Sequence, residues 1–343
     1  MAWTKQMPAR PVVAVAGATG AVGAEMLKVL EQRGFPASDV RALASERSAG
    51  KRLSFAGSEI VVQEMTESSF EGVDIALFSA GASVSKRFRD AVTSAGAVMI
   101  DNSSAFRMEP DVPLVVPEVN PEDAHTHDGV IANPNCSTIQ MVVALAPLER
   151  LAPIRRVVVA TYQAASGAGQ AAMDELYEQT ADFLAGRPIE PKRFAHRIAF
   201  NCIPHIDVFM ADGSTKEEWK MVVETQKIMH RPDLAVAATC VRVPVLRCHS
   251  EAVTVEFAAP VGLDDVRSAL TEAPGVTVLD DVAANLYPMP AMLEGTDDVY
   301  VGRIRRDSSV ENGVQMWVVA DQLRKGAALN AVQIAEMLLP RYY

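Results

Sequence analysis

Three glycines at a spacing of three constrain the fold of this chain more than any other feature. Gly17, Gly20 and Gly23 directly follow an apolar run at 11–16 that is typical of a strand buried on both faces. Apolar residues at helical spacing follow at 24–33. Such a turn lets a pyrophosphate approach the backbone where no Cβ intervenes, and the helix N-terminus supplies N–H donors. The spacing differs from the usual G-x-G-x-x-G, so a plain tight turn is the alternative.

Strands and helices alternate through the rest of the first hundred residues. The expected strands are short and apolar, and a helix is expected at 83–95 between two of them. Alternation of this kind predicts a parallel, doubly wound sheet. The further strands of this half are expected at 40–44, 73–79 and 97–100.

Strands predominate in the second half of the chain, with few helices between them. That pattern predicts a largely antiparallel sheet in an α+β domain. Because the pattern changes near Asn133, we expect residues 1–133 with 325–343 to form a nucleotide-binding domain and residues 134–324 to form a second domain. The expected elements are strands at 155–163, 235–246, 251–258, 299–305 and 314–320, and helices at 169–184 and 326–338.

Composition narrows the class of protein. Of the 343 residues 49% are hydrophobic, which is enough for the cores of two domains, and the net charge of −11 argues against nucleic acid as a partner. No apolar run reaches the ~18 residues that a membrane crossing needs, and residues 1–11 lack the apolar core of a signal peptide. The four cysteines form no C-x-x-C pair, so we expect no disulfide scaffold, no metal site and a reducing cytoplasm.

Cys136 lies where a polar run, Asn133-Pro134-Asn135, meets an apolar one. Such a junction is typical of a loop that leads into the first turn of a helix. The positive end of the helix dipole favours a thiolate there, which suits a nucleophile that attacks a carbonyl. A small buried apolar role is the alternative for an isolated cysteine.

The segment after the second expected strand bears on the choice of dinucleotide. Sites that prefer NAD usually place an acid there to hold the ribose 2′-hydroxyl. Here the one acid, Glu46, is outnumbered by Arg47, Lys51 and the hydroxyls of Ser45 and Ser48. Those groups can neutralise a 2′-phosphate, which favours NADP, and a solvated polar turn is the alternative.

Three further segments have side chains suited to chemistry at the ends of expected strands. The run at 161–169 combines a polar side chain with a glycine-rich turn, the run at 241–250 carries a histidine and two arginines, and the run at 101–108 follows a strand of the first domain. Ligands of parallel sheets bind beyond the carboxyl ends of the strands.

These runs resemble the aspartate-β-semialdehyde dehydrogenase family. Pro-Asn-Cys-Ser-Thr around Cys136 and Arg-Cys-His-Ser around His249 are the specific matches. The resemblance implies a Rossmann-type nucleotide-binding domain followed by a catalytic and dimerisation domain, with NADP as cofactor and a cytoplasmic homodimer, or a tetramer of paired dimers. The matching runs are 17–23, 101–108, 133–140, 162–169, 242–250 and 325–330.

The activity that the resemblance implies is reductive dephosphorylation of L-aspartyl-4-phosphate to L-aspartate 4-semialdehyde. This is a step toward lysine (through diaminopimelate), threonine and methionine. Cys136 is then the nucleophile that forms a thioester, and Gln163 orients the reacting carbonyl. His249 is the acid/base, for which we expect the ordinary pKa of about 6.5.

The resemblance also assigns binding residues. Arg242 would hold the substrate α-carboxylate, Glu217 the amino group, and Lys220 with Arg107 the phosphate, while Asn135 adjoins the nucleophile. An ordinary surface ion pair is the alternative for Glu217 and Lys220. The residues implied for the cofactor are Gly17, Thr19, Gly20, Ala21, Val22, Gly23, Ser45, Arg47, Ser48, Ser166, Gly167 and Asn330.

Arg242 and His249 are seven residues apart, so a continuous strand would direct them to opposite faces. Pro244 cannot donate to a ladder. We therefore predict that the strand is interrupted between them, so that both side chains reach one pocket.

Three other functions fit parts of this pattern. N-acetyl-γ-glutamyl-phosphate reductase has the same chemistry on a longer substrate, acetylated on nitrogen, which would offer no charge to Glu217. A non-catalytic nucleotide-binding module would be expected to lack the nucleophile or the base. A cysteine hydrolase would leave the glycine loop without a role.

Overall fold

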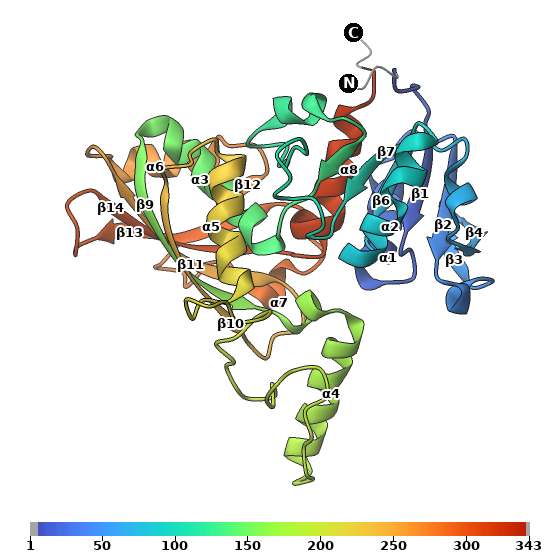
Figure 1. The fold of residues 1–343 in the computed structure, drawn as a ribbon. Coiled ribbons are helices and arrows are strands. Elements are labelled where there is room, and N and C mark those ends of the chain that lie inside the picture. The colour runs from blue at the N-terminus through green and yellow to red at the C-terminus, as the bar shows by residue number, and fades with distance from the viewer. Residues whose placement is uncertain (1–5, 341–343) are drawn as a thin grey trace. The chain divides into compact units, whose positions relative to one another are not determined.

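The computed structural model describes residues 6–340, whose contacts group into two compact units (Figure 1). The first comprises residues 6–135 and 327–340, and the second Cys136–Gly326. Both crossings fall two residues after the expected ones, at 135/136 rather than 133/134 and at 326/327 rather than 324/325. Residues 1–5, which belong to the segment where no signal peptide is expected, lie outside the described residues, as do 341–343.

The first unit is built on a six-stranded sheet in the order β5-β2-β1-β6-β7-β8. Every neighbouring pair in it is parallel, which confirms the doubly wound sheet. The order changes direction between β1 and β6, and ligands of such sheets bind beyond the strand ends at that point. The strands are β1 (Val12–Ala16), β2 (Asp39–Ala44), β5 (Gln63–Glu64), β6 (Ile75–Phe78), β7 (Val98–Asp101) and β8 (Val130–Ala132).

One apolar core joins this sheet to its helices. Val13, Val15 and Leu77 of the strands are fully buried in the same cluster as Val332 and Ile334 near the end of the chain. The C-terminal helix therefore belongs to the first unit, although it follows the whole second unit in sequence. The other elements are α1 (Ala21–Gln32), α2 (Ala82–Ser94), α8 (Leu329–Met337), the hairpin β3 (Arg52–Phe55) and β4 (Ser58–Val61), and the 3-10 turns η1 (Glu46–Ser48), η2 (Glu67–Phe70) and η3 (Pro121–Thr126).

The glycine loop between β1 and α1 packs too closely for side chains. Gly17 has φ +86°, and a Cβ there would lie 2.4 Å from the Ser79 carbonyl oxygen, beyond the end of β6. A Cβ on Gly23 would lie 2.1 Å from the Gly17 carbonyl oxygen. The loop thus folds back on the start of α1, which begins at Ala21, three residues before the expected helix.

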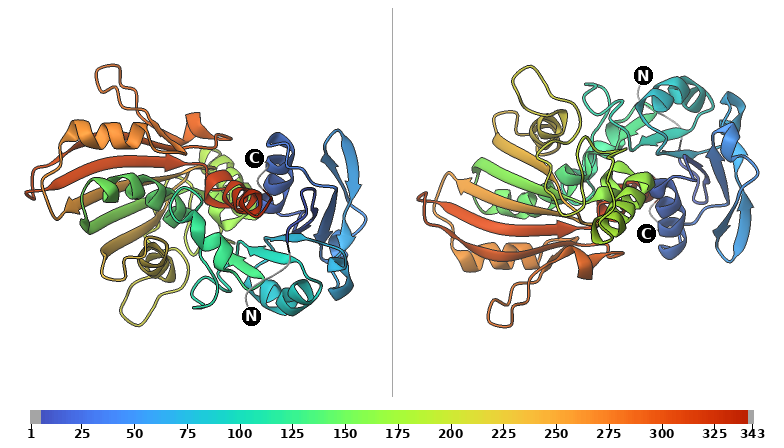
Figure 2. Two further views of the ribbon diagram at one scale, coloured as in Figure 1. Left: turned by 90° about the horizontal axis from the view of Figure 1, so that it is seen from above. Right: turned by 90° about the horizontal axis from the view of Figure 1, so that it is seen from below.

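The second unit is built on a mixed six-stranded sheet in the order β10-β9-β11-β14-β13-β12. Its central pairs are antiparallel, as expected, and the pair at each edge is parallel. Strands β9 and β11, far apart in sequence, lie side by side (Figure 2). The strands are β9 (Ile154–Gln163), β10 (Ala235–Arg242), β11 (His249–Phe257), β12 (Val276–Val278), β13 (Val299–Asp307) and β14 (Gly313–Ala320).

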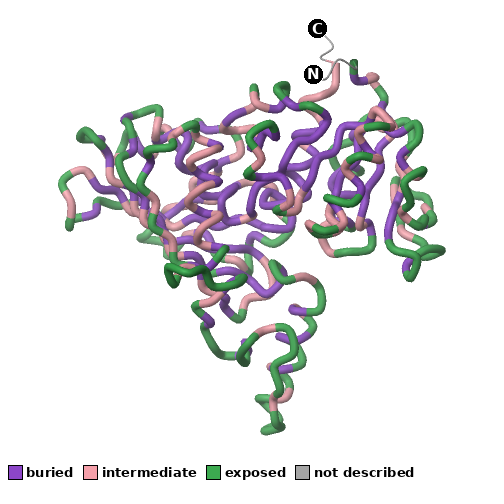
Figure 3. The backbone as a smooth tube through the Cα atoms, in the orientation of Figure 1, coloured by how far each residue is buried: buried purple, intermediate pink, exposed green. Residues whose placement is uncertain are grey.

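Helices α3, α5 and α6 pack on one face of this sheet, and burial alternates along the strands (Figure 3). The short helix α7 packs on the other face, where its Leu293 contacts Val319. His249, Glu251 and Val253 of β11 are buried toward the helices. On the other face Tyr162 is 38% exposed and stacks at an angle on Trp317. The helical elements are α3 (Cys136–Leu151), α4 (Gln170–Leu184), α5 (Lys216–Ile228), α6 (Leu263–Thr271), α7 (Pro290–Leu293), the 3-10 turn η4 (Ala165–Ala168) and the π-turn η5 (Arg324–Ala328).

The predicted interruption between Arg242 and His249 is confirmed, because β10 ends at Arg242 and β11 begins at His249. The expected strand at 235–246 was therefore four residues too long. The Val245 and Leu246 carbonyls instead accept hydrogen bonds from the Ala165 and Ser166 N–H groups. The connection thus leaves the sheet at Pro244, which has no N–H, and bonds to the glycine-rich turn.

None of the helices within residues 6–340 combines the length and the apolar character that crossing a bilayer would demand.

The glycine loop can be tested with a matched pair of substitutions. Gly23→Ala should destabilise the protein by about 1–3 kcal/mol, because the new methyl group collides with backbone that has no room to move. Gly20→Ala should cost less than about 1 kcal/mol, because Gly20 has φ −81° and its Cβ would lie 3.3 Å from the Gly17 carbonyl oxygen. Denaturant unfolding of both variants measures the difference, and equal losses would contradict this account of the loop.

Candidate active site

The candidate catalytic side chains of the second unit meet at one edge of its sheet. Strands β9 and β10 are parallel and end opposite each other at Gln163 and Arg242. Strand β11 runs antiparallel to β9 and begins at His249, beside Gln163. Since two strands end where the third begins, the three side chains come from neighbouring strand ends without any long-range adjustment.

Cys136 is the first residue of α3 and is partly buried. The Arg242 guanidinium is close enough to the thiol for the two groups to interact electrostatically. A Cβ on Gly326 would lie 2.9 Å from the Cys136 Cβ, so this position has room only for glycine. The helix start and the nearby cation both favour a thiolate over a thiol.

The side-chain nitrogen of Gln163 donates two hydrogen bonds. Its Nε2 donates to Ser137 Oγ in the first turn of α3 and to Glu217 Oε1 at 3.1 Å. Its Oε1 is buried and accepts no hydrogen bond from any residue in the described part of the chain. The sequence favoured Gln163 as a donor, whereas this arrangement leaves the oxygen as the group available to a ligand.

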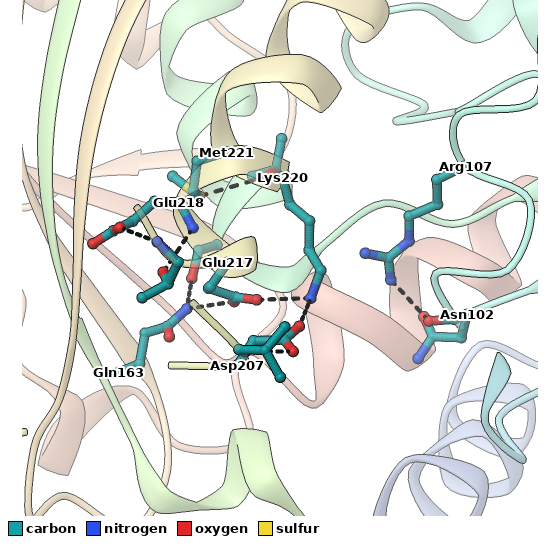
Figure 4. A network of polar contacts seen from close by, with 12 residues as sticks. Asn102, Arg107, Gln163, Asp207, Glu217, Glu218, Lys220 and Met221 are labelled. Atoms are coloured by element: carbon teal, nitrogen blue, oxygen red, sulfur yellow. Dashed lines mark hydrogen bonds and ion pairs between the residues drawn. The ribbon is translucent and has the colours of Figure 1, made fainter. Parts of the chain in front are cut away.

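Glu217 and Lys220 form a buried ion pair, and Asp207 bonds to the same lysine (Figure 4). Lys220 Nζ donates to Glu217 Oε2 at 3.0 Å and to Asp207 Oδ2 at 2.7 Å. The Lys220 and Glu217 side chains are only 11% and 7% exposed, so an ordinary surface ion pair does not describe them. Burial opposes the charge on Lys220, but the two carboxylates outweigh it and raise its pKa. No pattern along the chain pointed to Asp207, which lies in a loop.

Arg242 is buried and points toward the glycine-rich turn after β9. Its Nη1 donates to the Ala164 carbonyl oxygen at 2.7 Å, and its guanidinium lies 6.0 Å from the Phe194 ring centre. Burial lowers its pKa, and the neighbouring Glu217 carboxylate opposes that shift. A Cβ on Gly167 would lie 2.8 Å from Arg242 Nη1, so Gly167 is needed for the guanidinium to fit.

His249 is held by the backbone of the same residue, Ala164. Its Nδ1 accepts a hydrogen bond from the Ala164 N–H at 3.0 Å, which places the proton of the neutral ring on Nε2. Burial, together with the Arg242 charge, lowers the pKa of His249 to about 3. Our expectation of an ordinary pKa near 6.5 is therefore wrong for this ring: at neutral pH it is a neutral donor through Nε2.

The glycine-rich turn η4 carries Ser166 and Gly167, both implied for the cofactor. Gln322, a buried residue that no sequence pattern singled out, donates through Nε2 to Ser166 Oγ. Its Oε1 accepts from the Cys248 N–H at 2.8 Å. Cys248 has φ +71°, a strained conformation for a non-glycine residue, so Gln322 fixes the backbone that enters His249.

The first unit carries the other predicted residues. Arg107 is buried and donates through Nη2 to the Asn102 carbonyl oxygen at 2.9 Å. Asn135, also buried, is the last residue of this unit before α3. Asn330 donates through Nδ2 to the Val115 carbonyl oxygen and to Asn133 Oδ1, so its amide nitrogen already has a structural role.

The first unit fits the expected dinucleotide. Helix α1 has no side-chain cap and no acidic residue in its first turn, so its N-terminus can receive an anion. Ser45 and Arg47 are exposed directly after β2, whereas Ser48 is buried. The remaining predicted residues of the loop and of the first turn of α1 are Gly17, Thr19, Gly20, Ala21, Val22 and Gly23.

Within residues 6–340, no three His, Cys, Asp or Glu side chains gather closely enough to hold a metal ion. The four cysteines are thiols rather than disulfides.

The state of His249 can be read directly by NMR of protein labelled with ¹⁵N-histidine. We expect one ring with a proton on Nε2, none on Nδ1, and no titration between about pH 5 and 8, because its pKa lies near 3. The signal is assigned by its loss in His249→Asn. A His249 signal that titrates near pH 6.5, or a proton on Nδ1, would contradict the assignment.

Comparison with known proteins gives one consistent result. Residues 12–127 match the family described as "Semialdehyde dehydrogenase, NAD binding domain", and residues 145–325 match "Semialdehyde dehydrogenase, dimerisation domain". Aspartate-semialdehyde dehydrogenases of Synechocystis sp. and Aquifex aeolicus are 54% and 56% identical to this chain. The alignments cover 98% and 95% of this chain and 99% and 97% of those proteins.

Solved structures agree with the sequence relatives. Aspartate semialdehyde dehydrogenase II of Vibrio cholerae, solved with ASA, has a TM-score of 0.94 and 49% identity over 99% of this chain and all of that one. The Candida albicans enzyme, solved with NADP, has a TM-score of 0.74 and 28% identity over 96% and 98% of the two chains. With both family matches in place and relatives above 50% identity along nearly its whole length, the chain belongs to the aspartate-semialdehyde dehydrogenase family.

Proposed function

We propose that this chain reduces L-aspartyl-4-phosphate to L-aspartate 4-semialdehyde and phosphate with NADPH, through a thioester on Cys136. The observation that carries the proposal is the grouping of a helix-start thiol, a buried arginine and a neutral histidine at one sheet edge. A thiol in that setting is suited to attack an activated acyl group. Family membership supports the same reaction.

The substrate head group is matched by paired charges of the second unit. We assign Arg242 to the α-carboxylate, because a guanidinium binds that group through two parallel hydrogen bonds. Glu217 would hold the ammonium group, and Lys220, released in part from Asp207, would contact the phosphate. Arg107 and Asn135 of the first unit complete the proposed substrate set.

NADP is assigned to the glycine loop and to the turn after β2. The Candida albicans relative is solved with NADP, and the chain has Ser45 and Arg47 exposed where a 2′-phosphate would need partners. When bound, NADPH supplies the hydride that reduces the acyl group. Ser166 and Gly167 of η4 are assigned to the same cofactor, with Asn330 of α8.

Cys136 and His249 carry out the chemical steps of the proposed reaction. The Cys136 sulfur attacks the acyl phosphate carbon, the carbon–oxygen bond to phosphate breaks, and a thioester remains. After reduction, the thiohemiacetal carbon–sulfur bond breaks and the aldehyde leaves. Neutral His249 acts as a hydrogen-bond donor from Nε2 to the reacting oxygen, since its Nδ1 is occupied by the Ala164 N–H.

The first rival is N-acetyl-γ-glutamyl-phosphate reductase. An acetylated nitrogen carries no charge, and Glu217 would then face an uncharged group from a buried position. The charged pair therefore favours a free amino acid. A non-catalytic nucleotide-binding module is disfavoured because both Cys136 and His249 are present.

The family match and the cysteine content also bear on the oligomeric state and the cellular location of the protein. The second unit matches a dimerisation domain, and we assign the dimer contact to the sheet face that carries Tyr162 and Trp317. We propose a homodimer in a reducing cytoplasm, where four thiols are stable.

The decisive experiment follows NADPH formation by the purified protein from semialdehyde, NADP and phosphate. L-aspartate 4-semialdehyde should support phosphate-dependent turnover at least about 10²-fold faster than N-acetyl-glutamate 5-semialdehyde, because Glu217 selects a charged amine. Preference for the acetylated substrate, or activity that ignores phosphate, would overturn the proposal.

Cys136→Ser should abolish turnover by at least about 10³-fold while NADPH affinity changes less than about threefold, because the hydroxyl is a far weaker nucleophile of similar size. Mass spectrometry of the wild-type protein quenched with its acyl phosphate should find the acyl group on the peptide that contains Cys136. Retained activity in the variant, or an adduct elsewhere, would exclude Cys136 as the nucleophile.

A further inference from the structure

Glu251 is a fully buried carboxyl group without an evident counter-charge. It lies on β11 two residues after His249 and faces the helix-covered side of the sheet. Its cross-strand neighbours are Thr161 of β9 and Val318 of β14. Neither carboxyl oxygen has a hydrogen-bond partner among residues 6–340, whereas a buried carboxylate needs donors to both oxygens. An ionised carboxylate in such a place would be costly to bury.

Gln140, one turn after Cys136 on α3, lies against this carboxyl. Its Nε2 donates to the His249 carbonyl oxygen at 3.4 Å, and its Oε1 is also buried and has no hydrogen-bond partner within the described residues. The Glu251 oxygens and Gln140 Oε1 are thus buried acceptors of neighbouring residues, each without a donor in the described part of the chain. A protonated carboxyl satisfies both, because its O–H can donate to the amide oxygen.

The surrounding elements supply no charge that would hold a carboxylate. Charged residues elsewhere on α3, β9 and β10, such as Arg150, Arg156 and Arg242, are not among the causes of the Glu251 pKa shift. The titratable groups beside it are Cys240 on β10 and His249 on β11. The last of these is neutral, and β14 has no titratable residue.

We propose that Glu251 is a neutral carboxylic acid that donates its proton to Gln140 Oε1 and so ties the helix of Cys136 to the strand of His249. The chain of contacts runs from Glu251 through Gln140 to the His249 backbone. Glu251 is thus a positioning residue: it sets the distance between Cys136 and His249 and takes no part in the reaction itself. The proposal rests on the proposed function only in naming those two groups as reactive.

Protonation makes the contribution of Glu251 depend on pH. Burial raises its pKa well above the ordinary value, and the Gln140 side chain offsets that only in part. In the unfolded chain the group ionises near pH ~4.3, so above that pH the folded state holds a proton that the unfolded state has lost. The stability that Glu251 contributes is therefore complete below this pH and falls as pH rises toward the folded pKa.

Glu251→Gln separates charge from hydrogen bonding, because its amide nitrogen can donate to Gln140 Oε1 and cannot ionise. Relative to wild type, its folding equilibrium constant should rise by up to about tenfold for each pH unit above ~4.3, measured by denaturant unfolding at about pH 5.5, 7 and 8.5. All other groups are common to both proteins and cancel. A difference that does not vary with pH would overturn the proposal.

Glu175→Gln is the matched control. Glu175 is equally buried, but its oxygens accept hydrogen bonds from the Lys192 and Arg193 N–H groups, so it is held as an acceptor. Its replacement should destabilise the protein without a gain that grows with pH. The infrared difference spectrum of wild type minus Glu251→Gln at pH 7 should show the carbonyl band of a protonated acid, and a carboxylate band in its place would refute protonation.

Positioning is tested by kinetics. Glu251→Gln should keep kcat within about threefold of wild type, whereas Glu251→Leu, which removes the hydrogen bond, should lower kcat about tenfold or more with KM for phosphate and for the semialdehyde little changed. Equal kcat in both variants would overturn the positioning role. If Glu251→Leu does not fold, the pH dependence of Glu251→Gln still decides the protonation state. Absence of turnover in every protein, wild type included, would count against the proposed function alone.

Discussion

The site depends on the backbone of one residue, Ala164. Its carbonyl oxygen accepts from Arg242 and its N–H donates to His249, so two adjacent peptide units hold a cation and an imidazole. Both side chains can reach it only because the sheet is interrupted after Arg242 and resumes at His249. Gly167 then leaves the space that both side chains occupy. Backbone rather than side-chain chemistry thus sets the proton position on the ring.

The sequence predicted the architecture well where local patterns are strong. Apolar runs and their spacing identified the parallel sheet of the first unit and the strand-rich second unit. The odd separation between Arg242 and His249, together with Pro244, predicted the break between β10 and β11. Element ends were less accurate, because the end of a strand depends on which carbonyls find partners elsewhere. Val245 and Leu246 have strand-like side chains but bond to the turn after β9.

Partners of the predicted residues could not be read from the sequence. Asp207 lies in a loop and Gln322 in a polar segment after β14, and only the tertiary fold brings them to Lys220 and Cys248. The pKa of His249 was missed for a related reason. A residue's ordinary pKa assumes water around it, and no pattern along the chain reveals that this ring is sealed beneath the turn at 164–168.

Two ways of burying ionisable groups coexist within this unit. Lys220 stays charged because Glu217 and Asp207 outweigh the cost of its burial. His249 and Glu251 have no such compensation, and burial favours the neutral form of each. Their effects on stability oppose each other: stability from neutral His249 is lost as pH falls from ~6.5 toward 3, and that from neutral Glu251 is lost as pH rises above ~4.3. Because His249 and Glu251 are neutral, Arg242, Glu217 and Lys220 are the charges left to act on the thiol and on the substrate head group, where the proposed reaction needs them.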